Sequence, residues 1–550
     1  MIYIEDNRSN QSKIRQLQRQ SLILRPSSFV AFLMIASSLL ARPALSKPMP
    51  QKQNQKPLLS HQRQVTADVD LVRNSVLRVT VSSVRTDPVR PWVRRAADAY
   101  TVIGLVLGNG LIMIQADDIR NAVLIEVSRA DSYTREKAKL VLADMEANLA
   151  ILQIEKPDFL GGLKPIGFGK DAARGDDIIA ARTDSLFRVY RETARLIEYN
   201  ISSDYGFTRL PVFVFSAREN YQNGDLLLQK DRLVGIVAYQ QLQGKAVAVP
   251  VSRLLAFRDR AIQSIKNKSK YAGFVAQGIE LDDLVDPDLR SYVGLDDIDQ
   301  KPQKKVSQNF GAYVSVVLPK TTLTGVLKTG DVLLSLDGQP VDEKGLYRDP
   351  LLGLQRAELL LTRDVSGRYR LPGEQVKLEV LRSRKKETLS VTLKEYQGSA
   401  ERIPWLLSEN EPSYLIESGA VFVELSMPYL QGRYGKDWRR RSLQLSYLYD
   451  ANKYYKNDGD NDRIVVLSEV LPDSSNQGYQ SFGIDVVVSV NGKKPNDLTD
   501  MIQMIRDAKS KKKLVEVRLE DGSRVYLDPN ANSDNQRIKE TYHLPALSRP

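Results

Sequence analysis

The sequence predicts a mainly β protein, in which a long region of short strands, typical of a β-barrel or a β-sandwich, precedes two smaller modules of mixed strands and helices. Short runs of aliphatic and β-branched residues, divided by turn signals, recur from about residue 70 to 258, and helical periodicity is scarce there. Further along, Val332–Gly338 (VLLSLDG) is echoed by Val486–Gly492 (VVVSVNG). This weak internal repeat indicates two modules of one type.

The region of short strands begins with Ser75–Ser83, whose alternating pattern is typical of a half-buried strand. Apolar residues at helical spacing predict a closing helix over Arg253–Ile265. The further strands expected between them are Thr101–Leu107, Gly110–Gln115, Val123–Val127, Lys139–Leu142, Leu149–Ile154, Ile178–Ala181, Leu210–Phe215, Leu226–Leu228, Leu233–Ala238 and Ala246–Val251.

The two modules are expected over residues 270–397 and 411–548. Their repeated strands end in Asp-Gly and Asn-Gly, which are typical of tight turns. The insert Glu343–Glu374 is longer than a compact module needs, so we interpret it as a surface loop or flap. The other elements expected in the modules are Gly311–Leu318, Val376–Leu381, Thr388–Leu393, Ala420–Leu425, Ile464–Val470 and Val515–Leu519 as strands, and Leu498–Lys509 as a helix.

The first 46 residues are predicted to be a secretory signal peptide with an N-terminal extension. Phe29–Leu40 is an apolar run of twelve residues with basic residues before it, and the small residues Ala44 and Ser46 follow at cleavage-site spacing. Twelve residues are short for a bilayer span, so no stable membrane span is expected. An uncleaved anchor and a misassigned start are the alternatives. Residues 47–69 are read as a flexible polar arm, and export to the periplasm or cell envelope is expected.

Composition excludes several kinds of chemistry. The chain has no cysteine, which rules out disulfides, thiolate catalysis and cysteine-ligated metals. Its net charge of +12 is spread along the chain without a nucleic-acid-binding motif, so nucleic acid is not an expected partner. Asp117-Asp118 could suggest a metal ligand, but no histidine or third carboxylate accompanies it at ligand spacing. We therefore predict no metal and no cofactor.

Three segments carry a family likeness: Gly325–Val341 in the first module, Pro287–Leu295 as an early helix of that module, and Glu411–Leu430 at the start of the second module. In these segments the chain resembles the HtrA/Deg family of serine proteases, in its plant-type branch. The resemblance implies a chymotrypsin-like double β-barrel over residues 70–266, a PDZ domain over 270–397 and a divergent second PDZ domain over 411–548. It also implies a homo-oligomer built from trimers, and a mixed oligomer with an active relative is a further hypothesis.

The resemblance also aligns three segments with the family's catalytic triad. The segments are Gly110–Ile119 (GLIMIQADDI), Asn148–Leu152 (NLAIL) and Gly206–Pro211 (GFTRLP). In this alignment Asp117 takes the place of the histidine, Asn148 that of the aspartate and Thr208 that of the serine.

A Ser-His-Asp hydrolase needs an imidazole that takes a proton from the nucleophile and returns it to the leaving group. The chain has only two histidines, His61 and His543, and neither falls where the resemblance requires one. We therefore predict that no catalytic triad is intact and that the chain is not an enzyme but a pseudoprotease. The alternative is a serine endopeptidase that retains weak activity through displaced groups.

The resemblance places the carboxylate-binding loop of the first PDZ domain at Ala276-Gln277-Gly278-Ile279. A PDZ domain adds an extended peptide beside an exposed strand and holds its terminal carboxylate with backbone N–H groups. Peptides or unfolded proteins are therefore the expected partners. The predicted role is scaffolding, chaperone-like binding or regulation in envelope protein quality control. A purely structural envelope oligomer is a further alternative.

Overall fold

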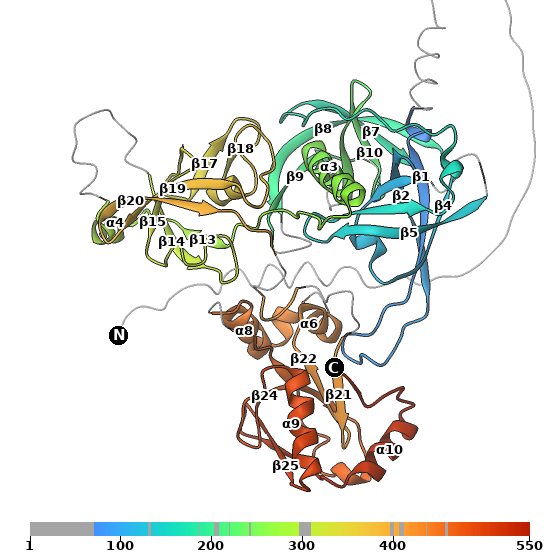
Figure 1. The fold of residues 1–550 in the computed structure, drawn as a ribbon, viewed down its shortest axis with the longest axis vertical. Coiled ribbons are helices and arrows are strands. Elements are labelled where there is room, and N and C mark those ends of the chain that lie inside the picture. Colours follow the sequence, from blue (N-terminus) through green and yellow to red (C-terminus); the bar gives the residue numbers. More distant parts are fainter. Residues whose placement is uncertain are drawn as a thin grey trace, which may run out of the picture. The chain divides into compact units, whose positions relative to one another are not determined.

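The computed structural model confirms the predicted fold class, because the chain is mainly β and its two closed barrels are followed by two mixed modules (Figure 1). The predicted signal peptide and polar arm lie outside the residues that the structure describes. Within the described part of the chain, no helix has the length and apolar character needed to cross a bilayer. The described residues are 71–129, 132, 134–184, 186–202, 208–218, 220–240, 244–295, 310–396, 401–405, 412–435, 437–456 and 460–550.

The first barrel forms because its strands alternate between buried and partly exposed residues. In β1 (Val76–Ser83), Leu77 and Val79 are fully buried, whereas Arg78 and Thr80 are partly exposed. Two short 3₁₀ turns, η1 and η2, interrupt the barrel strands. The other elements are β2 (Asp98–Gly108), β3 (Leu111–Ile114), η1 (Asp117–Ile119), β4 (Ala122–Ser128), β5 (Arg135–Asp144), β6 (Leu149–Ile154) and η2 (Pro157–Leu160), with the strands closed in the order β1-β2-β3-β6-β5-β4.

The longest strand of the second barrel is β8 (Val189–Ser202), a segment in which the sequence analysis predicted no strand. Charged residues interrupt the apolar pattern of this segment. Even so, Ala194, Leu196 and Tyr199 are buried, and the strand pairs with β7 on one side and β9 on the other. The other strands are β7 (Asp177–Thr183), β9 (Leu210–Ser216), β10 (Leu226–Gln229), β11 (Arg232–Gln240) and β12 (Lys245–Pro250), closed in the order β10-β11-β12-β9-β8-β7.

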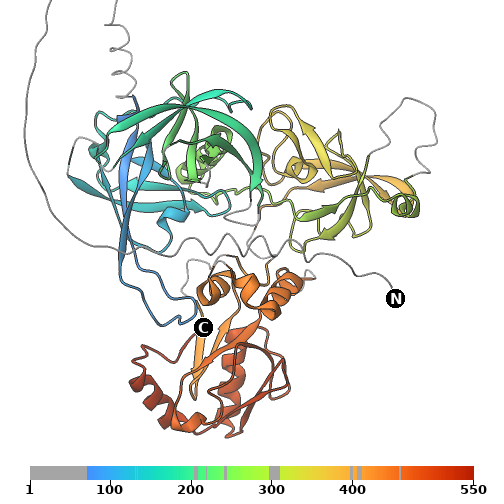
Figure 2. The ribbon, with the colours of Figure 1, turned by 180° about the vertical axis from the view of Figure 1, so that it is seen from behind.

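The predicted closing helix is confirmed as α3 (Val251–Asn267), which follows β12 directly (Figures 1 and 2). Leu254 and Phe257 are fully buried and pack in the same cluster as Val249 of the second barrel. The helix thereby anchors the chain where it passes from the barrels to the first module.

The first module (residues 270–396) is built on an antiparallel sheet whose edge strand is β13. This strand follows the predicted carboxylate-binding loop, and among the described strands it pairs with β14 alone. The predicted early helix is present as α4 (Pro287–Val293), with Asp286 accepting a hydrogen bond from the Leu289 N–H as its N-cap. The strands are β13 (Ile279–Asp282), β14 (Ala312–Val317), β15 (Val332–Leu336), β19 (Gln375–Arg382) and β20 (Lys385–Thr392) in that order, with β16 (Gln339–Pro340) beside β15.

The insert of the first module is not a surface loop, so that interpretation was wrong. It forms a hairpin of β17 (Leu346–Asp349) and β18 (Gly353–Arg356), followed by the 3₁₀ turn η3 (Ala357–Leu361). The leucines of η3 are buried in the module's core, and a buried ion pair joins Arg363 and Asp349 at 2.8 Å. Apolar burial and an internal counterion thus give this long segment a fixed structure.

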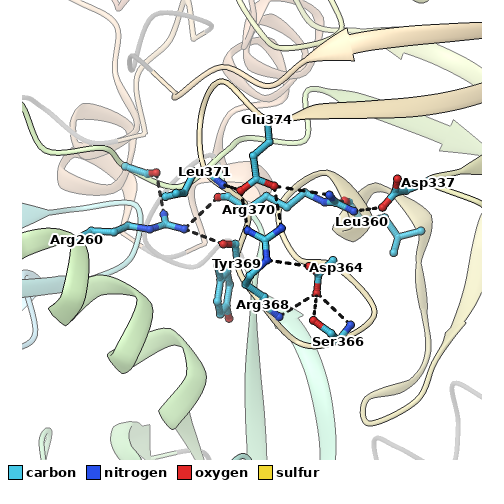
Figure 3. Close-up of polar contacts among 11 residues, drawn as sticks. Arg260, Asp337, Leu360, Asp364, Ser366, Arg368, Tyr369, Arg370, Leu371 and Glu374 are labelled. Atoms are coloured by element: carbon cyan, nitrogen blue, oxygen red, sulfur yellow. Dashed lines mark hydrogen bonds and ion pairs between the residues drawn. The ribbon is translucent and has the colours of Figure 1, made fainter.

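Arg260 of α3 fastens the insert to the second barrel (Figure 3). Its guanidinium donates hydrogen bonds to the carbonyl oxygens of Tyr369 at 3.1 Å, Arg370 at 3.0 Å and Gly273 at 3.0 Å. Desolvation is the main cause that lowers the pKa of this guanidinium. The first module is therefore held to the helix by a largely buried cation rather than by a surface contact.

The second module (residues 401–550) has a seven-stranded sheet with two more strands at one edge than its counterpart. Among the described strands the order is β26-β25-β24-β23-β22-β21-β27. The strands are β21 (Tyr414–Glu417), β22 (Ala420–Glu424), β23 (Val465–Val470), β24 (Asp485–Val490), β25 (Val515–Leu519), β26 (Arg524–Leu527) and β27 (Ser548–Arg549), and the helices are α6 (Met427–Tyr434), α7 (Trp438–Arg441), α8 (Leu443–Asn452), α9 (Leu498–Ser510) and α10 (Asn532–Thr541), with η4 at Ser474–Asn476.

Candidate functional site

Two of the three triad-aligned residues, Asp117 and Asn148, lie together in the first barrel. The backbone N–H of Asp117 donates a hydrogen bond of 2.8 Å to Oδ1 of Asn148. The amide nitrogen of Asn148 donates to Oε1 of Gln115 at 3.3 Å, and Gln115 in turn donates to the Val237 carbonyl of the second barrel at 2.8 Å. Asn148 is buried and has a positive φ of 51°. Hydrogen bonds through the side-chain amides of Asn148 and Gln115 therefore connect the two barrels at this position.

Asp117 and Asp118 lie on the 3₁₀ turn η1, beyond the end of the strand predicted over Gly110–Gln115. The Asp117 carboxylate pairs with Arg120 at 2.8 Å and is partly exposed. Asp118 is buried instead, accepting a hydrogen bond from Asn223 at 2.9 Å, and burial raises its pKa to about 6. The two carboxylates thus have different environments.

Thr208, the third triad-aligned residue, is fully buried at the start of the segment leading into β9. Its backbone N–H donates a hydrogen bond of 2.5 Å to Oε2 of Glu146. Among the described residues, its hydroxyl has no hydrogen-bond partner, and none of its hydrogen bonds reaches Asp117 or Asn148. In trypsin-like sites the corresponding N–H helps to stabilise the oxyanion. The sequence analysis missed Glu146, because no motif near this residue indicates that its carboxylate contacts the second barrel.

The predicted peptide-binding residues, Ala276 to Ile279, form the loop that leads into the edge strand β13. Ala276 and Gln277 are buried, and Ile279 is the first residue of the strand. Gly278 has a φ of +72°, and a Cβ there would lie 2.3 Å from Oγ1 of Thr321. Glycine is therefore required both by the backbone conformation and by the close approach of Thr321.

Gln277 fastens this loop to the residue that follows Thr208. Its Oε1 accepts a hydrogen bond from the Arg209 N–H at 3.0 Å, and its Nε2 donates to the Arg209 carbonyl at 2.7 Å. The same Nε2 donates to Oγ1 of Thr362 at 2.8 Å. One buried amide side chain thus joins the second barrel, the carboxylate-binding loop and the insert. The sequence analysis noted Gln277 only as a departure from an apolar residue.

Two cavities adjoin the loop and β13. The larger, of about 620 Å³, runs along Glu280 to Asp282 and is closed by Arg356 and Leu359 of the insert. The smaller, of about 210 Å³, lies at Gly278 and is lined by residues of the second module, among them Lys453 and Tyr454. Both cavities include Arg209 and Glu280 in their linings. The edge of β13 is therefore bordered by open space.

The second module offers no comparable open edge in the region that the structure describes. The sequence of β15 is repeated in β24, so these two strands correspond. β13 lies two strands from β15, and β22 lies two strands from β24, so β22 is the counterpart of β13. β21 pairs along β22, and β27 from the end of the chain pairs with β21. The position beside β22 that a bound peptide strand would occupy is thus taken by β21 of the same chain.

Two closed six-stranded barrels followed by modules of this topology define a trypsin-like protein with appended PDZ-type domains. A family model described as a PDZ domain matches residues 403–548. Three Arabidopsis thaliana relatives match most of the chain: putative protease Do-like 13 (25% identity, 87% of this chain, 89% of the relative), putative mitochondrial protease Do-like 3 (23%, 88%, 80%) and chloroplastic protease Do-like 2 (23%, 86%, 74%).

The chain is thus a homologue of the Deg/HtrA proteases. Among solved structures, it is similar to the HtrA-type protease AlgW with a decapeptide, at 18% identity and a TM-score of 0.42 over 60% of this chain and 98% of that one. The prediction that the chain is not an enzyme is contradicted, because the relatives that match most of its length are named proteases. The roles assigned to Asp117, Asn148 and Thr208 stay predictions.

Proposed function

We propose that this chain is a Deg/HtrA-type protein that captures extended polypeptide segments, from peptides or unfolded proteins, along the edge of β13. The observation that carries the proposal is the outer edge of β13, which directly follows the glycine-containing loop 276–279 and pairs with no further strand among the described residues. Arg356 of the insert donates one side-chain hydrogen bond of 2.9 Å to the Leu281 carbonyl of β13. An extended segment can complete the ladder of such an edge with backbone hydrogen bonds, whatever its sequence.

The loop offers donors for a terminal carboxylate. In the described part of the chain, the backbone N–H groups of Gln277 and Gly278 donate no hydrogen bond. Unpaired N–H groups beside a left-handed glycine are the feature with which PDZ domains hold a C-terminus. The cavity of about 620 Å³ along β13 has room for the side chains of a bound segment.

The cellular part of the proposal is export and a role as scaffold, chaperone or regulator in envelope protein quality control. The apolar run Phe29–Leu40 with its flanking residues supports export. Family resemblance supports assembly as trimer-based homo-oligomers or as mixed oligomers with an active relative. Signal cleavage is tested by N-terminal sequencing of the exported chain, and assembly by light scattering.

The experiment that tests capture measures the binding of a labelled heptapeptide to the full chain by fluorescence anisotropy. Gly278→Val should abolish binding, because a side chain there meets Thr321 and strains the loop. Gly338→Ala is the matched control, since Gly338 has a φ of +74° and open space around its Cβ position. Equal binding by Gly278→Val and the unmodified chain would refute the site.

A second candidate function is endopeptidase activity, which the protease names of the aligned relatives favour. Slow cleavage of unfolded casein by the full chain is the expected result. If Thr208 is the nucleophile, Thr208→Ala removes that cleavage, while Thr193→Ala on the exposed side of β8 retains it. Cleavage at equal rates by both variants would exclude Thr208, and no cleavage above a mock purification would refute this function.

A further inference from the structure

Glu280, the second residue of β13, lies between two cations that come from other parts of the chain. The Nη2 atom of Arg209, which follows the triad-aligned Thr208, is 4.0 Å from Oε1 of Glu280. The Nζ atom of Lys453, at the end of α8 in the second module, is also 4.0 Å from Oε1 of Glu280. Two positive charges thus converge on one carboxylate oxygen at the edge where a peptide would bind.

This carboxylate does not fully neutralise the two cations. Distances of 4.0 Å lie beyond the range of direct N–H···O hydrogen bonds, so neither cation is hydrogen-bonded to Glu280. The side chains of Arg209, Lys453 and Glu280 are 41%, 35% and 33% exposed, so all three can be reached by a ligand. Among the described residues, Glu280 is the one carboxylate within 4.0 Å of either cation, so Arg209 and Lys453 share a single close counterion. Of the other charged groups in the lining, Glu401 has a pKa raised to about 7 by burial, and Arg439 is paired with Asp450.

The surrounding cavity places these cations near the end of the groove that receives a C-terminus. Arg209, Lys453 and Glu280 line the cavity of about 210 Å³ together with Gly278 of the carboxylate-binding loop. The aromatic residues Trp405 and Tyr454 form part of the wall of this cavity. A strand added antiparallel to β13 would end at this loop, and because successive side chains alternate between faces, one of its last two side chains would face the cations.

We propose that the groove selects polypeptide segments with an acidic side chain in one of their last two residues, held between Arg209 and Lys453. The inference rests on the proposed capture of segments along β13. Glu280 holds the two cations in place when the groove is empty, as an internal counterion that a ligand carboxylate supplements. A neutral end would fill the cavity but leave Arg209 and Lys453 with Glu280 as their shared counterion.

The test uses two fluorescein-labelled heptapeptides that differ only in the last residue, glutamate or glutamine, each with a free or an amidated C-terminus. Anisotropy titrations of the full chain at low salt should show tighter binding of the glutamate peptide by roughly fivefold. Arg209→Met and Lys453→Met should each reduce that preference by roughly twofold. The backbone hydrogen bonds of Arg209 with Gln277 survive its replacement.

A gain-of-function variant keeps the proposal falsifiable if the cation variants lose structure. Glu280→Gln removes the competing charge and should enlarge the preference for glutamate, while Lys513→Met, an exposed lysine outside both cavities, should leave it unchanged. Equal binding of both peptides, with loss of binding on amidation, would overturn this inference and uphold capture. Absence of binding by every peptide would overturn capture, and this inference with it.

Discussion

β13 and β22 occupy the same position in the sheets of the two modules, but one is an edge strand and the other is not. In the first module β13 is left uncovered, whereas its counterpart β22 in the second module is covered by β21 and then by β27. The residues beside each edge differ as well. The open loop is fastened by Gln277 to the second barrel, whereas the turn between β21 and β22 is held by Asn476 and Asn535 of its own module.

This difference shows how one fold can serve binding in one copy and structure in the other. A covered edge has its ladder completed within the chain, so it offers few donors or acceptors to a ligand. An open edge whose loop is tied to a neighbouring barrel can transmit ligand binding to that barrel. The predictions below test each half of the comparison, from the largest expected effect to the smallest.

Replacing Tyr414 tests whether the covered edge is structural. The ring of Tyr414 is buried against Trp92 at a centroid distance of 5.5 Å, and its hydroxyl donates to the Ala546 carbonyl at 3.0 Å. Tyr414→Ala should lower the free energy of unfolding of the second module by about 3–5 kcal/mol. Calorimetry measures this loss, and Tyr526→Ala on exposed β26 is the control. Peptide binding gained by Tyr414→Ala would instead make β22 a latent groove.

Replacing Gln277 tests the tie between the open loop and the second barrel. Gln277→Leu would leave the Arg209 N–H and carbonyl without their partner, at a cost of about 2 kcal/mol for buried polar groups. Hydrogen exchange at the Arg209 amide should accelerate, and Gln375→Leu on the exposed side of β19 should leave it unchanged. If the Arg209 amide kept its protection, the loop and the barrel would be independent.

Glu401, which lines the smaller cavity, should make the open site sensitive to pH. Desolvation is the main cause that raises its pKa to about 7, with Glu146 raising it further and Arg463 opposing the shift. A raised folded-state pKa means that the carboxylate costs stability when it is ionised. This cost is absent below the ordinary value of 4.5 and complete above about 7.

Glu401→Gln should therefore unfold like the unmodified chain below pH 4.5 and be more stable by roughly 1–2 kcal/mol above pH 7. Urea midpoints measured across this range give the difference. Glu520→Gln at an exposed position is the control, and a constant difference at every pH would show that Glu401 acts through packing alone.

Local patterns in the sequence predicted most strands of the barrels and the helix that follows them, while the family resemblance implied the double barrel. Alternation in Ser75–Ser83 and the apolar spacing of Arg253–Ile265 each correspond to an element with nearly the same bounds. β8 was missed because Arg191, Glu192 and Arg195 interrupt its apolar pattern and mask the period of its buried face. The insert was misjudged because its order depends on the buried pair of Arg363 with Asp349, a contact between distant positions.

The candidate site was predictable only in part, for the same reason. Gly278 could be placed in the loop through the family resemblance, and its positive φ explains why this position is a glycine. The contacts of Glu146 with Thr208 and of Gln277 with Arg209 join residues more than sixty positions apart and follow no spacing rule. Likewise, the pairing of β21 with the end of the chain depends on two residues of β27 with no strand signature.

The smallest expected effect concerns the tie between the first barrel and the covered module. Arg90, between β1 and β2, donates two hydrogen bonds of 2.8 Å to Glu469 of β23, and its side chain is 54% exposed. A double-mutant cycle of Arg90→Ala and Glu469→Gln should give a coupling of about 0.5 kcal/mol that declines with added salt. A coupling above about 2 kcal/mol, unchanged at high salt, would mean that this pair is shielded from solvent. The covered module would then be tied to its barrel as firmly as the open module, and the contrast between them would lie in their edges alone.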